Sequence, residues 1–204
     1  MLRSFFSRKK TEAGCDEAGR GALAGPVVAA AVILHKRYRN EILNDSKKLS
    51  AAVRETMRTE ICEKAISWNV AMVDNNDIDR INILRATFKA MHMAIEGLIR
   101  YPELLLVDGN NFIPFRDVEF KTIIEGDSQF MSIAAASVLA KTYRDEYMIK
   151  LHEEYPQYGW ITNKGYGTPE HKRAIEKYGL SPYHRKTFRH GDSQLDLFGE
   201  KELQ

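Results

Sequence analysis

An unbroken apolar run at residues 26–34, made of Val, Ala, Ile and Leu after a single Pro, is the feature that most constrains the fold. A strand of this composition is buried on both faces, as in the middle of a sheet covered by helices. The run is far too short to span a bilayer. Residues 11–17 form a second strand pattern, and the short link at residues 18–25 makes the two strands antiparallel neighbours. We therefore expect this N-terminal pair to form the centre of a sheet.

Strand and helix patterns alternate along the rest of the chain. Further strands are expected at residues 66–73, 103–107 and 118–124, and helices at residues 50–65, 79–100, 133–151 and from Thr168 onward. Ser50 and Thr168 have the type and position of helix-capping residues, and Pro169 suits a first helical position. This order predicts an α/β domain with a mixed sheet at residues 11–151, followed by a helical, basic appendage at residues 152–190.

Positive charge is concentrated in the predicted appendage. The 204 residues carry a formal net charge of only +2, so the chain is not a polycation that binds nucleic acid without discrimination. Residues 156–190, however, contain seven Lys or Arg against two acids, interleaved with six aromatic residues. This composition suits a surface that tracks a nucleic-acid backbone and stacks on bases. It also suits a solvated basic helix packed by its own aromatics, which is the simpler interpretation for most of these residues taken singly.

Cysteine usage and the N-terminus predict a cytoplasmic protein. Cys15 and Cys62 form neither a disulfide framework nor a zinc spacing, so both are expected to be reduced. Residues 1–10 lack the apolar core of a signal peptide. No feature indicates an obligate dimer or membrane association, so a monomer is expected.

Two adjacent carboxylates, Asp16 and Glu17, end the first predicted strand, and Gly19-Arg20-Gly21 follows almost at once. Carboxylate oxygens suit a hard divalent cation. The glycines allow a ligand to approach the backbone closely, and a guanidinium can bind a phosphate with two hydrogen bonds. The alternative is an ordinary surface turn with scattered charges, and this segment alone does not decide between the two.

Two further acids follow the same pattern. Asp108 ends an interior strand before Gly109, and Asp127 lies just before a predicted helix. Taken singly, Asp108 suits a turn-forming Asp-Gly pair and Asp127 a plain helix cap. If all four acids meet at one end of the sheet, their repulsion requires cations to neutralise them. Two Mg²⁺ ions about 4 Å apart would do so, and would serve the hydrolysis of a phosphodiester.

Ordered motifs across residues 12–188 give the chain a clear resemblance to the bacterial ribonuclease HII family. They are Asp16-Glu17-Ala18-Gly19-Arg20-Gly21, Leu23-Ala24-Gly25-Pro26-Val27-Val28, Asp45-Ser46-Lys47-Lys48-Leu49, Val107-Asp108-Gly109, Gly126-Asp127, Ser132-Ile133-Ala134-Ala135-Ala136-Ser137-Val138-Leu139-Ala140-Lys141, Arg144-Asp145, Lys164-Gly165-Tyr166-Gly167-Thr168 and His184-Arg185. The resemblance implies a ribonuclease H-like fold, with a five-stranded mixed sheet flanked by helices and a C-terminal helical part. It also implies endonucleolytic cleavage of RNA in RNA–DNA hybrids and at single ribonucleotides embedded in duplex DNA, leaving 3′-hydroxyl and 5′-phosphate ends.

The resemblance also assigns roles to individual residues. Asp16, Glu17, Asp108 and Asp127 match the catalytic carboxylates that bind two Mg²⁺ or Mn²⁺ ions. The turn of Gly19, Arg20 and Gly21 matches the one that reads the ribose 2′-hydroxyl, the group that distinguishes RNA from DNA. Tyr166 matches the tyrosine that stacks on the sugar after the ribonucleotide, at the RNA-to-DNA junction.

Several of the remaining candidate residues have two interpretations. Lys47, His184 and Arg185 are predicted to contact the substrate, although Lys47 also suits an exposed turn. His171 and His184 suit phosphate contacts or ordinary helix and surface positions equally well. Asp145 lies four residues after Lys141 on a predicted helix, where an ion pair is favoured over a metal role.

The C-terminal residues 191–204 form a predicted flexible tail. Within it, Gln194-Leu195-Asp196-Leu197-Phe198 looks like the short peptide by which bacterial replication and repair proteins bind the sliding clamp. Leu195, Leu197 and Phe198 have no evident core to join, and such apolar anchors fill pockets in a partner. Folding of the segment back onto its own domain is an equal alternative.

Two competing functions remain at this point. One is a nucleic-acid-binding or clamp-associated module with a degenerate site, against which the intact set of four acids argues. The other is a carboxylate nuclease of the same fold that does not require a 2′-hydroxyl. Cleavage of a DNA duplex containing one ribonucleotide distinguishes both from the leading hypothesis.

Overall fold

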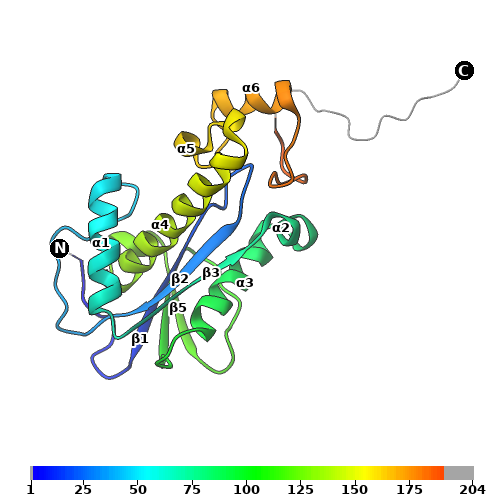
Figure 1. Cartoon of the computed structure of the whole chain (residues 1–204). Helices are drawn as coiled ribbons and strands as arrows, with labels where there is room; N and C mark the ends of the chain where they lie inside the picture. The colour runs from blue at the N-terminus through cyan, green and yellow to red at the C-terminus, as the bar shows by residue number, and fades with distance from the viewer. Residues whose placement is uncertain (1, 191–204) are drawn as a thin grey trace, which may run out of the picture.

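The computed structural model describes residues 2–190, so the predicted tail segment at residues 194–198 lies outside the described residues. Its centre is a five-stranded sheet in the order β3-β2-β1-β4-β5 (Figure 1). The strands are β1 (Glu12–Ala18), β2 (Val27–Ile33), β3 (Ser67–Val73), β4 (Leu104–Asp108) and β5 (Glu119–Ile123). All five lie within two residues of the segments that the sequence predicts.

The strand directions make the sheet mixed, as expected. β2 runs antiparallel to both β1 and β3, whereas β1 and β4, and β4 and β5, are parallel pairs. Every residue of β2 is buried, which confirms its predicted place inside the sheet. Because β1 and β4 are parallel neighbours, with Cys15 opposite Val107, their carboxyl ends lie at the same edge of the sheet.

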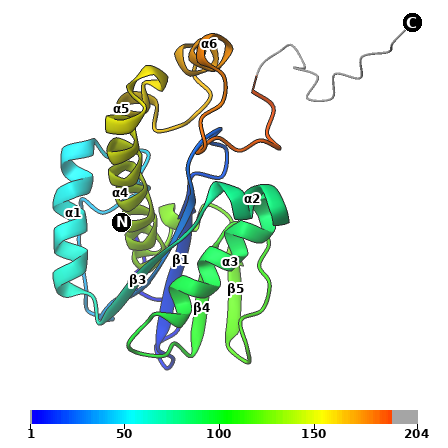
Figure 2. The ribbon, with the colours of Figure 1, turned by 45° about the vertical axis from the view of Figure 1, so that its right-hand side comes forward.

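Helices cover both faces of the sheet (Figure 2). On one face pack α1 (Ala51–Lys64) and the long α4 (Met131–Glu154), and on the other lie α2 (Asn75–Ile81) and α3 (Ile83–Glu96). α4 approaches β1 so closely that a Cβ atom at Gly14 would overlap the backbone of Ser132 and Ile133. The small-residue run on α4, from Ala134 to Ala136, is fully buried.

The single helix expected at residues 79–100 is instead two helices, and that prediction was wrong. The break falls at Asn82, which has a positive φ of 66° and accepts a hydrogen bond from the backbone N–H of Arg85 at 3.1 Å. Asn82 is thus the N-cap of α3, and Asp74 caps α2 in the same way. The apolar periodicity continues across the break, which is why the pattern alone suggested one helix.

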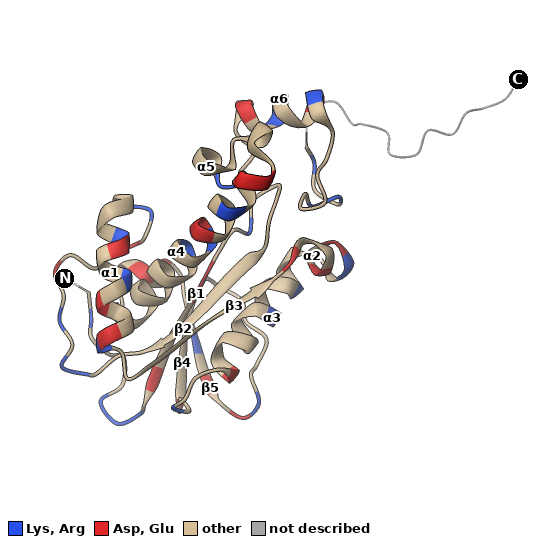
Figure 3. Ribbon diagram, in the orientation of Figure 1, with Lys and Arg blue, Asp and Glu red and all other residues tan. Residues whose placement is uncertain are grey.

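The C-terminal part stands at one end of the sheet and carries the short helices η2 (Pro156–Tyr158), α5 (Trp160–Asn163) and α6 (Pro169–Tyr178). It has its own apolar cluster, in which Tyr158 and Trp160 are buried and stack at a centroid distance of 5.2 Å. Tyr158 and Trp160 therefore pack inside the C-terminal part and are not available to stack on the bases of a nucleic acid. Figure 3 shows acids and bases mixed along α6, while β2 carries no charge.

None of the helices within residues 2–190 combines the length and apolar character needed to cross a membrane.

Candidate active site

The structure brings the four predicted acids to one edge of the sheet. Asp16 lies near the end of β1, and Asp108 is the last residue of the neighbouring parallel strand β4. Asp127 lies in the 3-10 helix η1 (Gly126–Ser128), which follows β5. The carboxylate of Asp108 accepts a hydrogen bond from the backbone N–H of Gly126 at 2.7 Å, which ties the end of β4 to η1.

Asp16 is the most buried of the four acids, with 5% of its surface exposed. Its side chain accepts a hydrogen bond from the backbone N–H of Glu17 at 2.7 Å and another from the Ser137 hydroxyl on α4. Burial raises the pKa of Asp16 well above its ordinary value, and the charges of Glu17 and Asp108 raise it further. The carboxylate of Asp16 is thus held in a place where ionisation is costly unless a cation is near.

Asp127 has the same kind of environment. Its pKa rises from an ordinary 3.8 to about 6 because of burial first, and then because of the charges of Asp45 and Asp108. It is not the cap of the following helix, since the N-cap of α4 is Phe130 and no side chain caps that end. The helix-cap alternative for Asp127 is therefore excluded.

Glu17 and Lys47 bring opposite charges to this edge. Burial raises the pKa of Glu17, although Arg20 opposes the rise through an ion pair of 3.2 Å. Burial lowers the pKa of Lys47, but Asp45, Asp16, Asp127 and Asp108 outweigh it, so the net change is upward. Lys47 is exposed to solvent, but it lies close enough to the acids for their negative charges to raise its pKa.

The donor set fits a hard divalent cation, because all four side chains offer carboxylate oxygens and no sulfur or imidazole. The side chains are nevertheless not assembled as ligands: within residues 2–190, no three His, Cys, Asp or Glu side chains are placed together for a metal ion. Glu17 turns to Arg20, Asp108 to Gly126 and Asp127 to Asp45. A cation held by these four acids together would require their side chains to leave these partners, and its charge would offset their mutual repulsion.

The turn of Gly19, Arg20 and Gly21 begins directly after β1. Gly19 is buried with φ 93°, and a Cβ atom there would overlap the guanidinium of Arg144, so only glycine fits. Arg20 and Gly21 are exposed, and a Cβ atom at Gly21 would meet no atom within 4 Å. The turn thus presents its tip to solvent beside the acids while its base is packed.

Tyr166 lies beside this turn. A β-bridge joins it to Ala22, and its half-buried ring lies under the Arg144 guanidinium at 5.2 Å and the Lys141 ammonium at 5.7 Å. Cation–π contacts with these two groups therefore help to hold the Tyr166 ring in place.

His184 and Arg185 lie elsewhere than predicted, since both are fully buried. Arg185 donates to the carbonyl oxygens of Gly19, Arg20, Gly25 and Pro26, at distances of 2.7 to 3.1 Å. His184 lies against Trp160 and is 3.1 Å from the ring nitrogen of His171, which is buried as well. We therefore correct the prediction: burial leaves these side chains no surface for direct contact with a substrate.

Asp145 forms the predicted ion pair with Lys141, at 2.7 Å, with Arg54 at 4.0 Å on its other side. Three residues with no predicted role lie beside the site: Ser137 contacts Asp16, Asp45 contacts Asp127, and the Arg144 side chain packs against Gly19. All three residues lie inside the motifs that carry the family resemblance, and this position is the sequence signal that could have identified them.

Comparison with solved structures defines the class of protein. The ribonuclease H2 of Pyrococcus horikoshii superposes with a TM-score of 0.75 at 25% identity, over 88% of this chain and 94% of that one. Ribonuclease HII in the PCNA complex from Archaeoglobus fulgidus superposes with a TM-score of 0.74 at 24% identity, over 92% of this chain and all of that one. The fold is ribonuclease H-like, and the protein is a metal-dependent enzyme of the ribonuclease H class.

Sequence comparison narrows the class to one family. The family model described as Ribonuclease HII matches residues 13–191. The ribonuclease HII of Bacteroides thetaiotaomicron is 54% identical over 198 residues, which cover 97% of this chain and 99% of that protein. The chain belongs to the ribonuclease HII family.

Proposed function

We propose that this enzyme cuts at single ribonucleotides embedded in duplex DNA, as well as in the RNA strand of RNA–DNA hybrids. The products are a 3′-hydroxyl and a 5′-phosphate. Asp16, Glu17, Asp108 and Asp127 bind two divalent cations, Mg²⁺ or Mn²⁺, and Gly19, Arg20 and Gly21 detect the 2′-hydroxyl.

The observation that carries this proposal is that the turn follows directly after the strand that holds Asp16 and Glu17. Asp16 and Glu17 lie in β1, and the open tip at Arg20 and Gly21 follows within a few residues, in the turn directly after this strand. A group recognised at the tip is thereby placed beside the acidic site. Recognition and cleavage are therefore coupled by position, because a phosphodiester that is held beside the catalytic groups reacts faster than one that meets them by diffusion.

The cations, when bound, would supply an activated water and stabilise the departing 3′-oxygen. The four carboxylates hold these charges in place, and the Ser137 hydroxyl orients Asp16. Backbone groups at Gly19 and Gly21 and the Arg20 guanidinium bind the ribose hydroxyl and its phosphate. Tyr166 supports the next sugar, and Lys47 contributes positive charge where the scissile phosphate approaches the acids.

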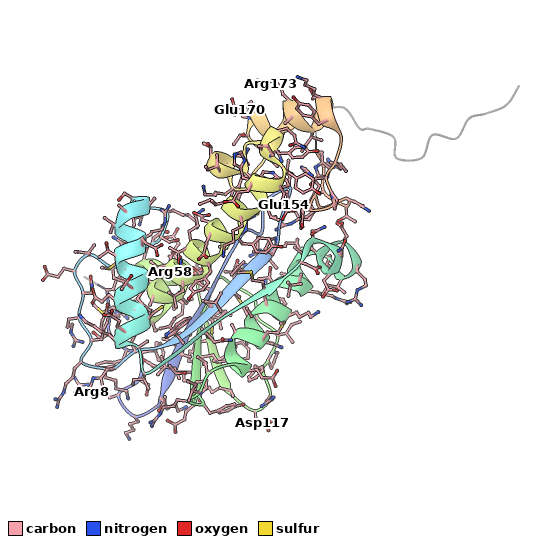
Figure 4. All side chains as sticks on the ribbon, viewed as in Figure 1. Arg8, Arg58, Asp117, Glu154, Glu170 and Arg173 are labelled. Atoms are coloured by element: carbon pink, nitrogen blue, oxygen red, sulfur yellow. The ribbon has the colours of Figure 1, made fainter. Side chains whose placement is uncertain are left out.

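The role of the acids is tested with Asp108→Asn against the matched control Asp117→Asn. Asp117 is exposed and lies at the far end of the molecule from α6 (Figure 4). We expect D108N to fold, to lose measurable Mn²⁺ binding in calorimetry and to stop cutting a duplex that contains one ribonucleotide. D117N should match the wild type in both assays. Normal cleavage by D108N would remove Asp108 from the site.

A second partner is proposed for the C-terminal tail. Gln194, Leu195, Leu197 and Phe198 lie outside the described residues, and the proposal rests on their resemblance to clamp-binding peptides. A solved complex of ribonuclease HII with PCNA from Archaeoglobus fulgidus supports it as a precedent in a similar fold. Deletion of residues 194–204 should leave cleavage intact and abolish binding to a bacterial sliding clamp in a pull-down. Retained clamp binding would refute this proposal.

A further inference from the structure

Two buried arginines, Arg144 and Arg185, contact the backbone in and around the turn at Gly19 and Arg20. Arg144 on α4 donates to the carbonyl oxygens of Pro26 at 3.0 Å, Lys164 at 2.9 Å and Ala24 at 3.1 Å. Arg185 donates to four carbonyl oxygens on the same link between β1 and β2, of which Gly19 and Arg20 belong to the turn itself. Neither side chain has any exposed surface.

These contacts are unusual for arginine, which is seldom fully buried without an acidic partner. Burial, and after it the nearby charge of Arg144, lower the pKa of Arg185 to about 9. The two side chains supply hydrogen-bond donors to a backbone link that forms no regular ladder and in which Ala24, Gly25 and Pro26 are buried.

The two arginines also join the turn to the C-terminal part. Arg185 enters from the segment after α6, and the backbone N–H of Arg185 donates to Leu23 at 2.9 Å. Arg144 reaches Lys164 and lies over the ring of Tyr166. The turn and Tyr166 are far apart in the chain but are joined by the Ala22–Tyr166 bridge and by backbone hydrogen bonds from Leu23 and Ala24 to Gly165, and the two arginines add side-chain contacts on both sides of this junction.

We propose that Arg144 and Arg185 are positioning residues that set the distance between the 2′-hydroxyl-reading turn and Tyr166, and thereby fix which phosphodiester is cut. This inference rests on the proposed function. Lysine cannot replace either arginine, because one ammonium cannot reach the three carbonyl groups around Arg144 or the four around Arg185. Arg185→Lys and Arg144→Lys should therefore loosen the turn without touching the four acids.

The test uses a duplex with a short run of ribonucleotides flanked by DNA, and the full-length protein with Mn²⁺. The wild type should cut at one preferred position. R185K should bind Mn²⁺ as the wild type does, spread its cuts over neighbouring phosphodiesters, and lose on the order of a hundredfold in kcat/KM on a single embedded ribonucleotide. Partial unfolding would lower the rate but would not move the cut position, so the spread separates positioning from mere stability.

Arg58→Lys is the matched control. Arg58 lies between α1 and α4 (Figure 4), where it pairs with Glu146 at 3.0 Å and covers the ring of Tyr143, and neither partner belongs to the link between β1 and β2. R58K should lose stability and keep the cut position. A wild-type cut position and rate in folded R185K would overturn the inference. If R185K does not fold, R144K carries the test with the same two outcomes.

Failure of this inference and failure of the proposed function give different results. If the wild type cuts an all-DNA duplex as well as the ribonucleotide duplex, the proposed function is wrong. If the wild type requires the ribonucleotide but R185K keeps its cut position and rate, only the positioning role is wrong.

Discussion

Replacement of Asp127 by Asn should abolish cleavage and at the same time stabilise the protein without metal. The pKa of Asp127 rises from 3.8 in the unfolded chain to about 6 in the fold, through burial and then the charges of Asp45 and Asp108. A rise of this size corresponds to about 3 kcal/mol. Asn has the shape of the protonated acid, and its amide can donate to Asp45 in the same way, so the substitution removes the cost of the charge while the contact remains.

The sign of the pH dependence follows from proton uptake. Between pH 3.8 and about 6 the folded state binds more protons at Asp127 than the unfolded state does, so wild-type stability falls as pH rises through this window. Below pH 3.8 both states are protonated and the cost is absent. D127N should thus be about 3 kcal/mol more stable than the wild type at pH 8 and equally stable near pH 3.8.

Urea unfolding in the presence of a chelator, at a series of pH values, measures this difference. His184, whose pKa burial lowers to about 3, titrates in the same range, but its contribution is common to both proteins and cancels. Added Mn²⁺ should stabilise the wild type and leave D127N almost unchanged, because binding to the folded state alone raises stability. A D127N variant that is no more stable than the wild type at pH 8 would refute the electrostatic account of the site.

Three further predictions concern the surroundings of the site. Gly14→Ala should destabilise the fold by about 3 kcal/mol or more in urea unfolding, because the new methyl group meets the backbone of Ser132 and cannot be accommodated by a side-chain rotation; near-wild-type stability would mean that α4 can shift. Asp145→Asn should keep kcat/KM within about twofold of the wild type, since Asp145 pairs with Lys141 and Arg54 and has no part in the proposed metal site; a loss of Mn²⁺ binding would instead restore a metal role. Ser137→Ala should weaken Mn²⁺ affinity by about tenfold in calorimetry, because Asp16 loses the hydroxyl that orients it, and an unchanged affinity would contradict that role.

The sequence predicts the sheet and the gathering of the acids because both depend on local patterns. The apolar run of β2 identifies the inside of the sheet, and acids at the ends of strands meet wherever those strands are parallel neighbours. The break at Asn82 was missed, although Asn at that position is a capping residue, since the apolar spacing around it continues without interruption.

Burial of charged residues is what the sequence could not reveal. Arg185 and His184 look like surface groups, because arginine and histidine beside aromatics in a basic segment usually contact solvent or phosphate. The role of Arg185 depends on carbonyl groups more than a hundred residues earlier in the chain, and His184 is buried among His171, Ser181 and Trp160, contacts that appear only in the folded structure. The orientation of the acids toward Arg20 and Gly126 is hidden from the sequence for the same reason.

The most direct test of the whole account uses two DNA duplexes that differ by one 2′-hydroxyl. Both are incubated with the wild-type protein and Mg²⁺ or Mn²⁺, and the ends are mapped. The account predicts cleavage of the duplex that contains the ribonucleotide, with 3′-hydroxyl and 5′-phosphate ends, and no cleavage of the all-DNA duplex. Equal cleavage of the two duplexes, or cleavage of neither, would contradict the coupling of the Gly19-Arg20-Gly21 turn to the four acids.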